Sequence, residues 1–326
     1  MNKVRARGMH LPLFWGILAV VFFLFLRDPA KTGQWMARGL SVAVYKALPA
    51  VFPYLILSSL FFKSGFPALF CGRVSRAIAK TLNIPTSGVS ALLMGVIAGF
   101  PLGASCTAQL YQSSLCTREE AERLSAICNF CAPPFLLGAF GVGVFGDIRY
   151  GMLLFAVQTV VALGYGILLG KRAKRARKES HEKEDQAPQQ STASVCLLFP
   201  LIGECIAKGA LQMVRIGGYV LFFSLLAGVI QDTFPALFEM FPTLRAVVCG
   251  FFEISSGVAA IEEASALSFF TGALMIGWSG VSVHLQTASF LRQAGLSSKP
   301  YLLAHVLLPP ITATLSLVAG RMLSIF

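Results

Sequence analysis

The sequence predicts an all-α, polytopic integral membrane protein with two inverted repeats, each containing a re-entrant helical hairpin. Hydrophobic residues make up 56% of the chain and charged residues only 13%, which leaves too little polar surface to coat a soluble protein. Three runs without Asp, Glu, Lys or Arg are each long enough to cross about 30 Å of hydrocarbon. They are Tyr150–Gly170, Ala264–Leu291 and Pro300–Gly320.

The positive charge of the chain indicates membrane topology and not nucleic-acid binding. The formal net charge is +12, but the basic residues lie in short clusters between apolar runs. Lys3, Arg5 and Arg7 precede the apolar run Leu11–Leu26, which lacks a following small-residue cleavage site. We therefore expect an uncleaved first helix with its amino terminus in the cytoplasm, and we assign residues 1–48 to this helix and an interfacial helix.

A polar segment, residues 171–193, predicts a cytoplasmic linker that divides the chain. It is rich in Lys, Arg, Glu and Gln, has no apolar periodicity, and is expected to be solvated and flexible. Its first basic residues directly follow an apolar run, which places it in the cytoplasm by the positive-inside rule. The linker separates a first repeat, residues 49–170, from a second repeat, residues 194–326.

The two repeats resemble each other in the order of their segments. Tyr54–Ser59 is similar to Tyr219–Ser224, and each follows an amphipathic stretch that could lie in the membrane interface. A Gly-rich apolar segment then follows in each half after a polar break, at Leu92–Gly103 and at Val247–Gly257. Internal repeats are common in secondary transporters, although short apolar segments can also be alike by chance.

Basic clusters and apolar runs together predict an inverted topology. To keep the linker in the cytoplasm, Gly88–Ser113 must enter and leave the membrane on the same side, as a re-entrant hairpin that lines a cavity. The alternative is a small-residue packing face formed by Gly95, Gly99 and Gly103. The expected spans are Leu11–Leu26, Ala50–Phe62, Leu124–Gly146, Tyr150–Gly170, Ile216–Gln231, Ala264–Leu285 and Tyr301–Gly320. Thr117 and Glu120 form a capping box that predicts the start of a charged helix in water.

Glu253 is the most informative single residue, because a carboxylate in an apolar segment is expensive in lipid unless it faces a cavity. It could couple a cation or proton, or accept a hydrogen bond from substrate; the alternative is a structural hydrogen bond to a broken helix. His284 could donate to an anion or simply meet headgroups, and Asn129 could bind substrate or satisfy carbonyls freed by Pro133 and Pro134. The candidate substrate-binding residues are Gly99, Pro101, Gly103, Ser105, Thr107, Asn129, Glu253, Ser255, Ser256, Ser282, His284 and Gln286.

The sequence does not indicate an enzyme or a metalloprotein. Cys128 and Cys131 form a C-x-x-C pair without the second pair or the nearby histidines of a metal site. A nucleophile with its base, a metal cluster and a phosphate-binding loop are also missing from the sequence. We therefore expect no catalytic residue and no cofactor, with Na⁺ or H⁺ as the possible coupling ion. The expected partners are a small-molecule substrate and the lipid bilayer, and a homo-oligomer stays open.

Six motifs resemble the YlbJ family of sporulation integral membrane proteins: Gly99–Ala104, Thr117–Leu124, Ile127–Asn129, Phe252–Gly257, Gly280–Gln286 and Lys299–Leu302. The resemblance runs from Ala47 to Leu315 and departs from the family pattern at Phe130-Cys131-Ala132. It implies that each repeat is a nucleoside-recognition or Gate domain, in an architecture related to concentrative nucleoside transporters.

The family resemblance also implies a cargo and a location. The implied cargo is dipicolinate, moved during spore formation across the mother-cell-derived membrane around the forespore. Two alternatives stay open, namely a carrier of nucleosides or other metabolites with the same fold, and a non-transporting membrane scaffold for spore assembly.

The topology has a direct test. Reporter fusions at Gln189 and after Phe326 should report opposite sides of the membrane, because the basic clusters place the linker in the cytoplasm and about seven spans place the carboxyl terminus outside. Both reporters on one side would rule out the inverted-repeat arrangement.

Overall fold

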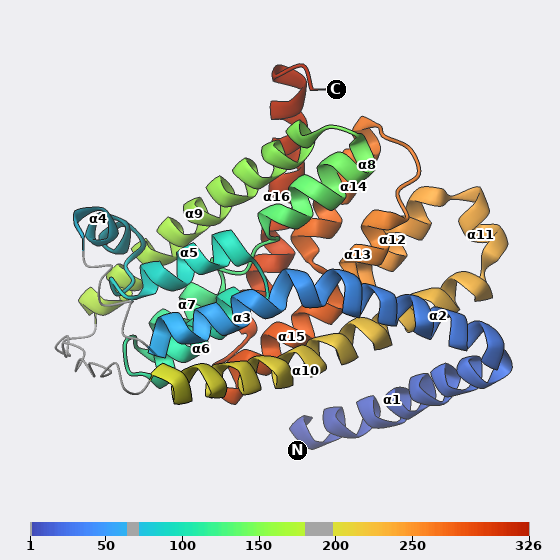
Figure 1. Cartoon of the computed structure of the whole chain (residues 1–326), viewed down its shortest axis with the longest axis horizontal. Coiled ribbons are helices and arrows are strands. Elements are labelled where there is room, and N and C mark those ends of the chain that lie inside the picture. The colour runs from blue at the N-terminus through green and yellow to red at the C-terminus, as the bar shows by residue number, and fades with distance from the viewer. Residues whose placement is uncertain (1, 64–71, 180–197, 326) are drawn as a thin grey trace.

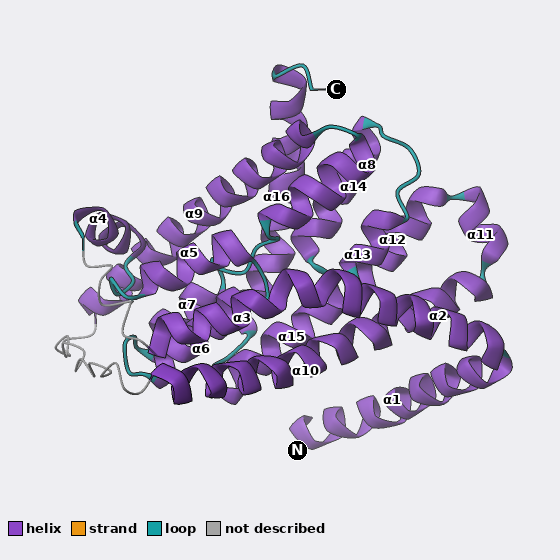
Figure 2. Cartoon of the chain, in the orientation of Figure 1, coloured by secondary structure: helices purple, strands orange, loops and turns teal. Residues whose placement is uncertain are grey.

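The computed structural model describes residues 2–63, 72–179 and 198–325, and the regular structure in these ranges is helical throughout (Figure 2). The first half contains α1 (Asn2–Arg27), α2 (Pro29–Ser41), the π-helix η1 (Val42–Ala47), α3 (Leu48–Lys63), α4 (Arg73–Leu82), α5 (Gly88–Ala98), α6 (Leu102–Gln112), α7 (Arg118–Ser125), the π-helix η3 (Phe135–Val142), α8 (Gly143–Phe145) and α9 (Ile148–Glu179). The second half contains α10 (Leu198–Thr233), α11 (Pro235–Met240), α12 (Pro242–Phe252), α13 (Ile254–Ala259), α14 (Ala266–Trp278), α15 (Gly280–Gln293) and α16 (Lys299–Met322).

Four helical segments of the described ranges are long and apolar enough to cross a membrane: Ile148–Arg175, Pro200–Thr233, Ala266–Gln293 and Lys299–Met322. Other apolar helices, such as α5 and α12, have 11 residues each and are too short to cross alone. The predicted class, an all-α membrane protein, is confirmed.

After α1, the two halves present their elements in the same order (Figure 1). Each half begins with a long helix, either the chain of α2, η1 and α3 or the single helix α10. A short helix follows, then two short helices joined at a break (α5 and α6, α12 and α13), then a discontinuous helix (α7 and η3, α14 and α15), and finally a long helix, α9 or α16. This order supports the internal repeat. Its inversion and the re-entrant hairpins depend on where the bilayer lies, and they stay predictions.

Two predicted spans each contain a break in the helix. In Leu124–Gly146 the helix ends at Ser125 and residues 126–132 are non-helical, because Pro133 and Pro134 lack N–H donors and disfavour helical backbone before them. In Ala264–Leu285 the helix breaks at Ser279 and Gly280, whose φ angles are 73° and 84°. A left-handed serine is uncommon, and the prediction did not use Gly280 as the sign of a break.

Two other boundaries also differ from the prediction. Helix α9 continues to Glu179, so the first nine residues of the expected flexible linker are helical, and its residues 180–193 lie outside the described ranges. Lys and Arg are good helix formers, which lets the helix extend past its apolar part. Helix α10 joins the expected interfacial stretch and the following span in one helix, Leu198–Thr233. The capping box is confirmed, since Thr117 accepts from the amide of Glu120 and the Glu120 side chain accepts in return.

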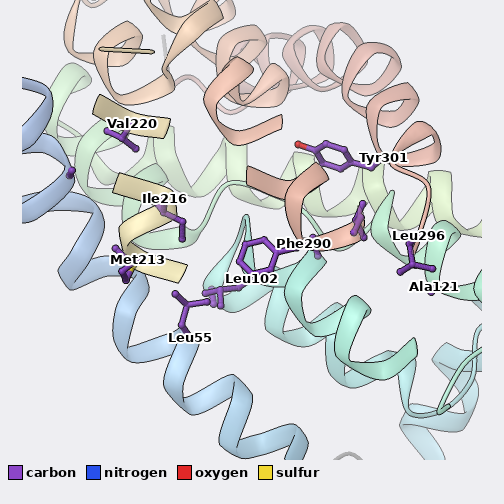
Figure 3. Packing of buried hydrophobic residues seen from close by; sticks show 13 residues of the cluster. Leu55, Leu102, Ala121, Met213, Ile216, Val220, Phe290, Leu296 and Tyr301 are labelled. Carbon is purple, nitrogen blue, oxygen red and sulfur yellow. The ribbon is translucent and has the colours of Figure 1, made fainter. Parts of the chain in front are cut away.

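The core crosses between the halves. Helices α2 and α3 pack along α10 (Figure 1), and one hydrophobic cluster joins Leu55 of α3, Leu102 of α6, Ile216 of α10 and Phe290 of α15 (Figure 3). Close approach of α2 to α10 depends on Gly228, where an added Cβ would lie 2.0 Å from the ring of Trp35. The two halves therefore share a hydrophobic cluster.

The Gly228 contact predicts a stability difference between two alanine variants of α10. Gly228→Ala should lower the thermal unfolding midpoint in detergent, because the new methyl group displaces the Trp35 ring. Gly203→Ala, on the same helix with open space around it, should leave the midpoint unchanged or raise it, since alanine favours the helix by about 0.5–1 kcal/mol. Equal midpoints for the two variants would contradict this packing.

Candidate functional site

The first helix break lies between α5 and α6, at Gly99 and Pro101. Three glycines face the non-helical segment 128–132. An added Cβ at Gly95 or Gly103 would lie 1.9 or 1.8 Å from the carbonyl oxygen of Cys128, and one at Gly99 would lie 2.7 Å from the amide nitrogen of Ala132. The glycine spacing thus serves a packing face, and that face receives an irregular backbone and not a second helix.

Asn129 holds this segment against the break. Its side chain is buried; Oδ1 accepts from the Ala104 amide at 2.9 Å, and Nδ2 donates to the Ser125 carbonyl at 2.7 Å. Asn129 therefore satisfies backbone groups on both α6 and α7. The carbonyls freed by Pro133 and Pro134 are those of Asn129 and Phe130, and they pair with His305 and the Phe100 amide, so the Asn129 side chain does not take the expected role of satisfying them.

Side chains from the two long helices pair two backbone carbonyls of the segment. Gln158 Nε2 of α9 donates to the Cys131 carbonyl at 2.9 Å, and His305 Nε2 of α16 lies 3.0 Å from the Asn129 carbonyl. The sequence analysis missed both residues. Each is a rare polar side chain in an otherwise uncharged run, and that rarity was the signal available to find them.

The second break, between α12 and α13, is centred on Glu253. Its buried carboxylate accepts from the amides of Ser255 (3.1 Å) and Ser256 (2.7 Å) and from the Ser256 hydroxyl (2.9 Å). A carboxylate there caps α13 and complements the positive end of its helix dipole. The alternative role proposed for Glu253, a structural hydrogen bond to a broken helix, matches these contacts.

The break between α14 and α15 packs on the break at Glu253. Gly280 makes this possible, because an added Cβ would lie 3.2 Å from the carbonyl oxygens of both Gly250 and Phe252. In each half, the joint of the short helix pair therefore touches the joint of the discontinuous helix. The two halves form their candidate sites in the same way.

One break from each half, the non-helical segment 126–132 and the break at Ser279, borders one small cavity of about 40 Å³. Its polar lining comes from both halves: Asn129, Gln158, Ser279, His305 and Thr312. A cavity of this size holds water molecules but excludes a metabolite. In the described conformation this cavity therefore has room for water and not for a small-molecule substrate.

The remaining candidates lie on α6 and α15, which pack against each other. Their hydroxyl and amide groups bond mainly within their own helices, as Thr107 does with the Gly103 carbonyl (2.8 Å) and Gln286 with Ser282 (3.0 Å). Ser105 accepts from Gln109 at 3.2 Å. His284 differs, since its Nδ1 lies 2.9 Å from the Tyr301 hydroxyl and its ring meets Trp278 edge-on.

An open groove of about 550 Å³ lies between α10 and α15, and sequence analysis did not indicate it. Its walls include Tyr219, Phe222 and Leu285, with Arg215 and Ser289 as polar groups. Arg215 Nη1 also donates to Gln293 Oε1 at 3.1 Å. A cation beside aromatic walls suits a small aromatic anion. Within the described ranges, no group of three His, Cys, Asp or Glu side chains is placed to hold a metal ion.

Asn129 should contribute strongly to stability. Asn129→Ala leaves the Ala104 amide and the Ser125 carbonyl buried without their partner, at about 1–3 kcal/mol for each group. We expect a clearly lower thermal unfolding midpoint in detergent. Gln109→Ala is the control, because it removes a side-chain bond to Ser105 without unpairing a backbone group; an equal loss in both variants would contradict the role of Asn129.

Comparison with known proteins gives one relative. The chain is 27% identical, over an alignment of 333 positions that covers 92% of this chain and 81% of the relative, to the sporulation integral membrane protein YlbJ of Bacillus subtilis (strain 168). No family model and no solved structure matches the chain. The protein is therefore similar, over nearly its whole length, to a sporulation integral membrane protein, which supports the family resemblance of its motifs.

Proposed function

We propose that this protein is a membrane transporter of a small anionic metabolite, with dipicolinate during spore formation as the cargo. The observation that carries the proposal is that one helix break from each half borders a shared small cavity with polar groups in its lining. Irregular backbone at membrane depth is tolerated where protein or water satisfies it, and transporters place their substrate and ion sites at such joints.

The groove beside Arg215 supports an anionic cargo. Its volume suits a small aromatic molecule, Arg215 can pair with a carboxylate, and Tyr219 and Phe222 offer faces for stacking. The central cavity is too small for such a molecule in this conformation. We place first contact of the cargo at the groove, followed by movement toward the breaks when they separate.

The proposed role in sporulation is based on the similar Bacillus subtilis protein, whose name describes a sporulation integral membrane protein. Dipicolinate itself comes from the family resemblance of the motifs. It is an aromatic dianion, so its charge and shape fit the groove chemistry. The proposed location is the mother-cell-derived membrane around the forespore.

Uptake by reconstituted vesicles tests the proposal. Vesicles that contain the full chain should accumulate labelled dipicolinate above the level of empty vesicles, and excess unlabelled dipicolinate should compete better than excess nucleoside. Uptake at the level of empty vesicles would reject transport of dipicolinate, and stronger competition by nucleoside would favour the nucleoside carrier.

Arg215 should set the affinity for the anion. Arg215→Gln should raise the dipicolinate concentration for half-maximal uptake by about 10-fold or more, because hydrogen bonds to charged groups contribute about 1.5–3 kcal/mol. Lys208→Gln is the matched control, since Lys208 lies on the same helix and pairs at the surface with Glu204. A similar change in both variants would assign the effect to general surface charge.

A further inference from the structure

We propose that His305 is the coupling-ion site of this transporter, binding one proton that fastens the Asn129 carbonyl to α16. This inference rests on the proposed transport function and names its coupling ion. It assigns the proton to α16, where the sequence analysis had considered Glu253.

The hydrogen-bond partners of His305 require two N–H groups. Its Nδ1 lies 3.0 Å from the Tyr301 carbonyl oxygen and its Nε2 lies 3.0 Å from the Asn129 carbonyl oxygen. Both partners can only accept, whereas a neutral imidazole carries a single N–H. Only the imidazolium donates at both positions. Without the extra proton, a nitrogen lone pair faces a carbonyl lone pair at one of the two contacts.

The surroundings suit a proton that comes and goes. His305 is buried but borders the small cavity, which has room for water as a proton carrier beside Asn129, Gln158 and Thr312. The His284 ring lies 5.7 Å from the His305 ring, and the Tyr301 ring lies 4.2 Å from it. His284 Nδ1 is bonded to the Tyr301 hydroxyl, while its Nε2 is buried without a hydrogen-bond partner.

The other titratable groups near α16 do not take the place of His305. The cavity-lining residues of α9 and α14 are uncharged, and the non-helical segment contributes the thiols of Cys128 and Cys131. Helix α7, which packs on α16, carries Arg118, Glu119, Glu120, Glu122 and Arg123. Glu122 accepts from Arg118 and from the Ser297 amide, Glu120 accepts from the Thr117 amide, and Arg123 donates to the Asn83 carbonyl. Among the residues that line the cavity, an imidazolium would be the one positive charge, stabilised by two carbonyl dipoles.

The position of Asn129 links proton binding at His305 to the docking of the non-helical segment on α16. Its carbonyl belongs to the non-helical segment that touches the first break, and its side chain fixes that segment to α6 and α7. A bound proton favours the conformation in which the segment is docked on α16, and its release favours separation. A ligand that binds two conformations differently shifts their populations, so the proton and the opening of the site are linked.

Nuclear magnetic resonance of ¹⁵N-histidine tests the proton without requiring transport. The chain has four histidines, and the double variant His10→Gln, His181→Gln leaves His284 and His305. In lipid at pH 6 the full-length double variant should show one imidazolium signal that His305→Gln removes and His284→Gln retains. Neutral signals only, from pH 5 to pH 8, would overturn the proposal even if His305→Gln failed to fold. So would an imidazolium signal that survives His305→Gln.

Proton movement in vesicles supplies the second readout. Dipicolinate added to vesicles with an enclosed pH dye should move protons with the wild-type protein, and His305→Gln should lose this movement because its amide can hold the Asn129 carbonyl without titrating. Glu239→Gln, exposed on α11, is the control that should retain it. Dipicolinate uptake without proton movement by the wild type would overturn the coupling role. Absence of uptake by the wild type would instead reject the proposed cargo, while the resonance result would still decide the proton site.

Discussion

Pairing of backbone polar groups is the constraint on which this structure depends. In a membrane each unpaired N–H or C=O costs several kcal/mol, so a broken helix is stable only where other groups replace its lost hydrogen bonds. The protein breaks its helices in both halves and brings the joints together in its interior. Side chains of Asn129, Gln158 and Glu253 then supply the missing partners.

Glycine provides the space that this pairing needs. In the first half Gly95, Gly99 and Gly103 let the segment 128–132 lie directly against the helix pair, and in the second half Gly280 brings one joint onto the other. An alanine at Gly103 would already overlap the Cys128 carbonyl. The glycines and the polar side chains therefore act together. The close packing at the glycines brings backbone carbonyls within hydrogen-bond distance of the side chains that donate to them.

The same partners connect stability to the proposed mechanism. Hydrogen bonds inside a regular helix are fixed, whereas a carbonyl held by a side chain is released when that side chain moves or changes its protonation. The Asn129 carbonyl, held from α16, is such a group. Glu253 is more firmly engaged, because three donors converge on its carboxylate. The site thus combines a firmly held carboxylate at Glu253 with a carbonyl at Asn129 that can be released.

Composition and charge pattern by themselves determined the membrane class, the Gly-rich break at Gly99 and the capping box at Thr117, because these follow from local chemistry. The order of segments also indicated the repeat. Only the tertiary structure decided the second break at Ser279, the helical continuation of α9 to Glu179, and the partners of Gln158 and His305. A carbonyl 176 residues away along the chain leaves no local trace in the sequence around a histidine, so packing alone identifies the pair.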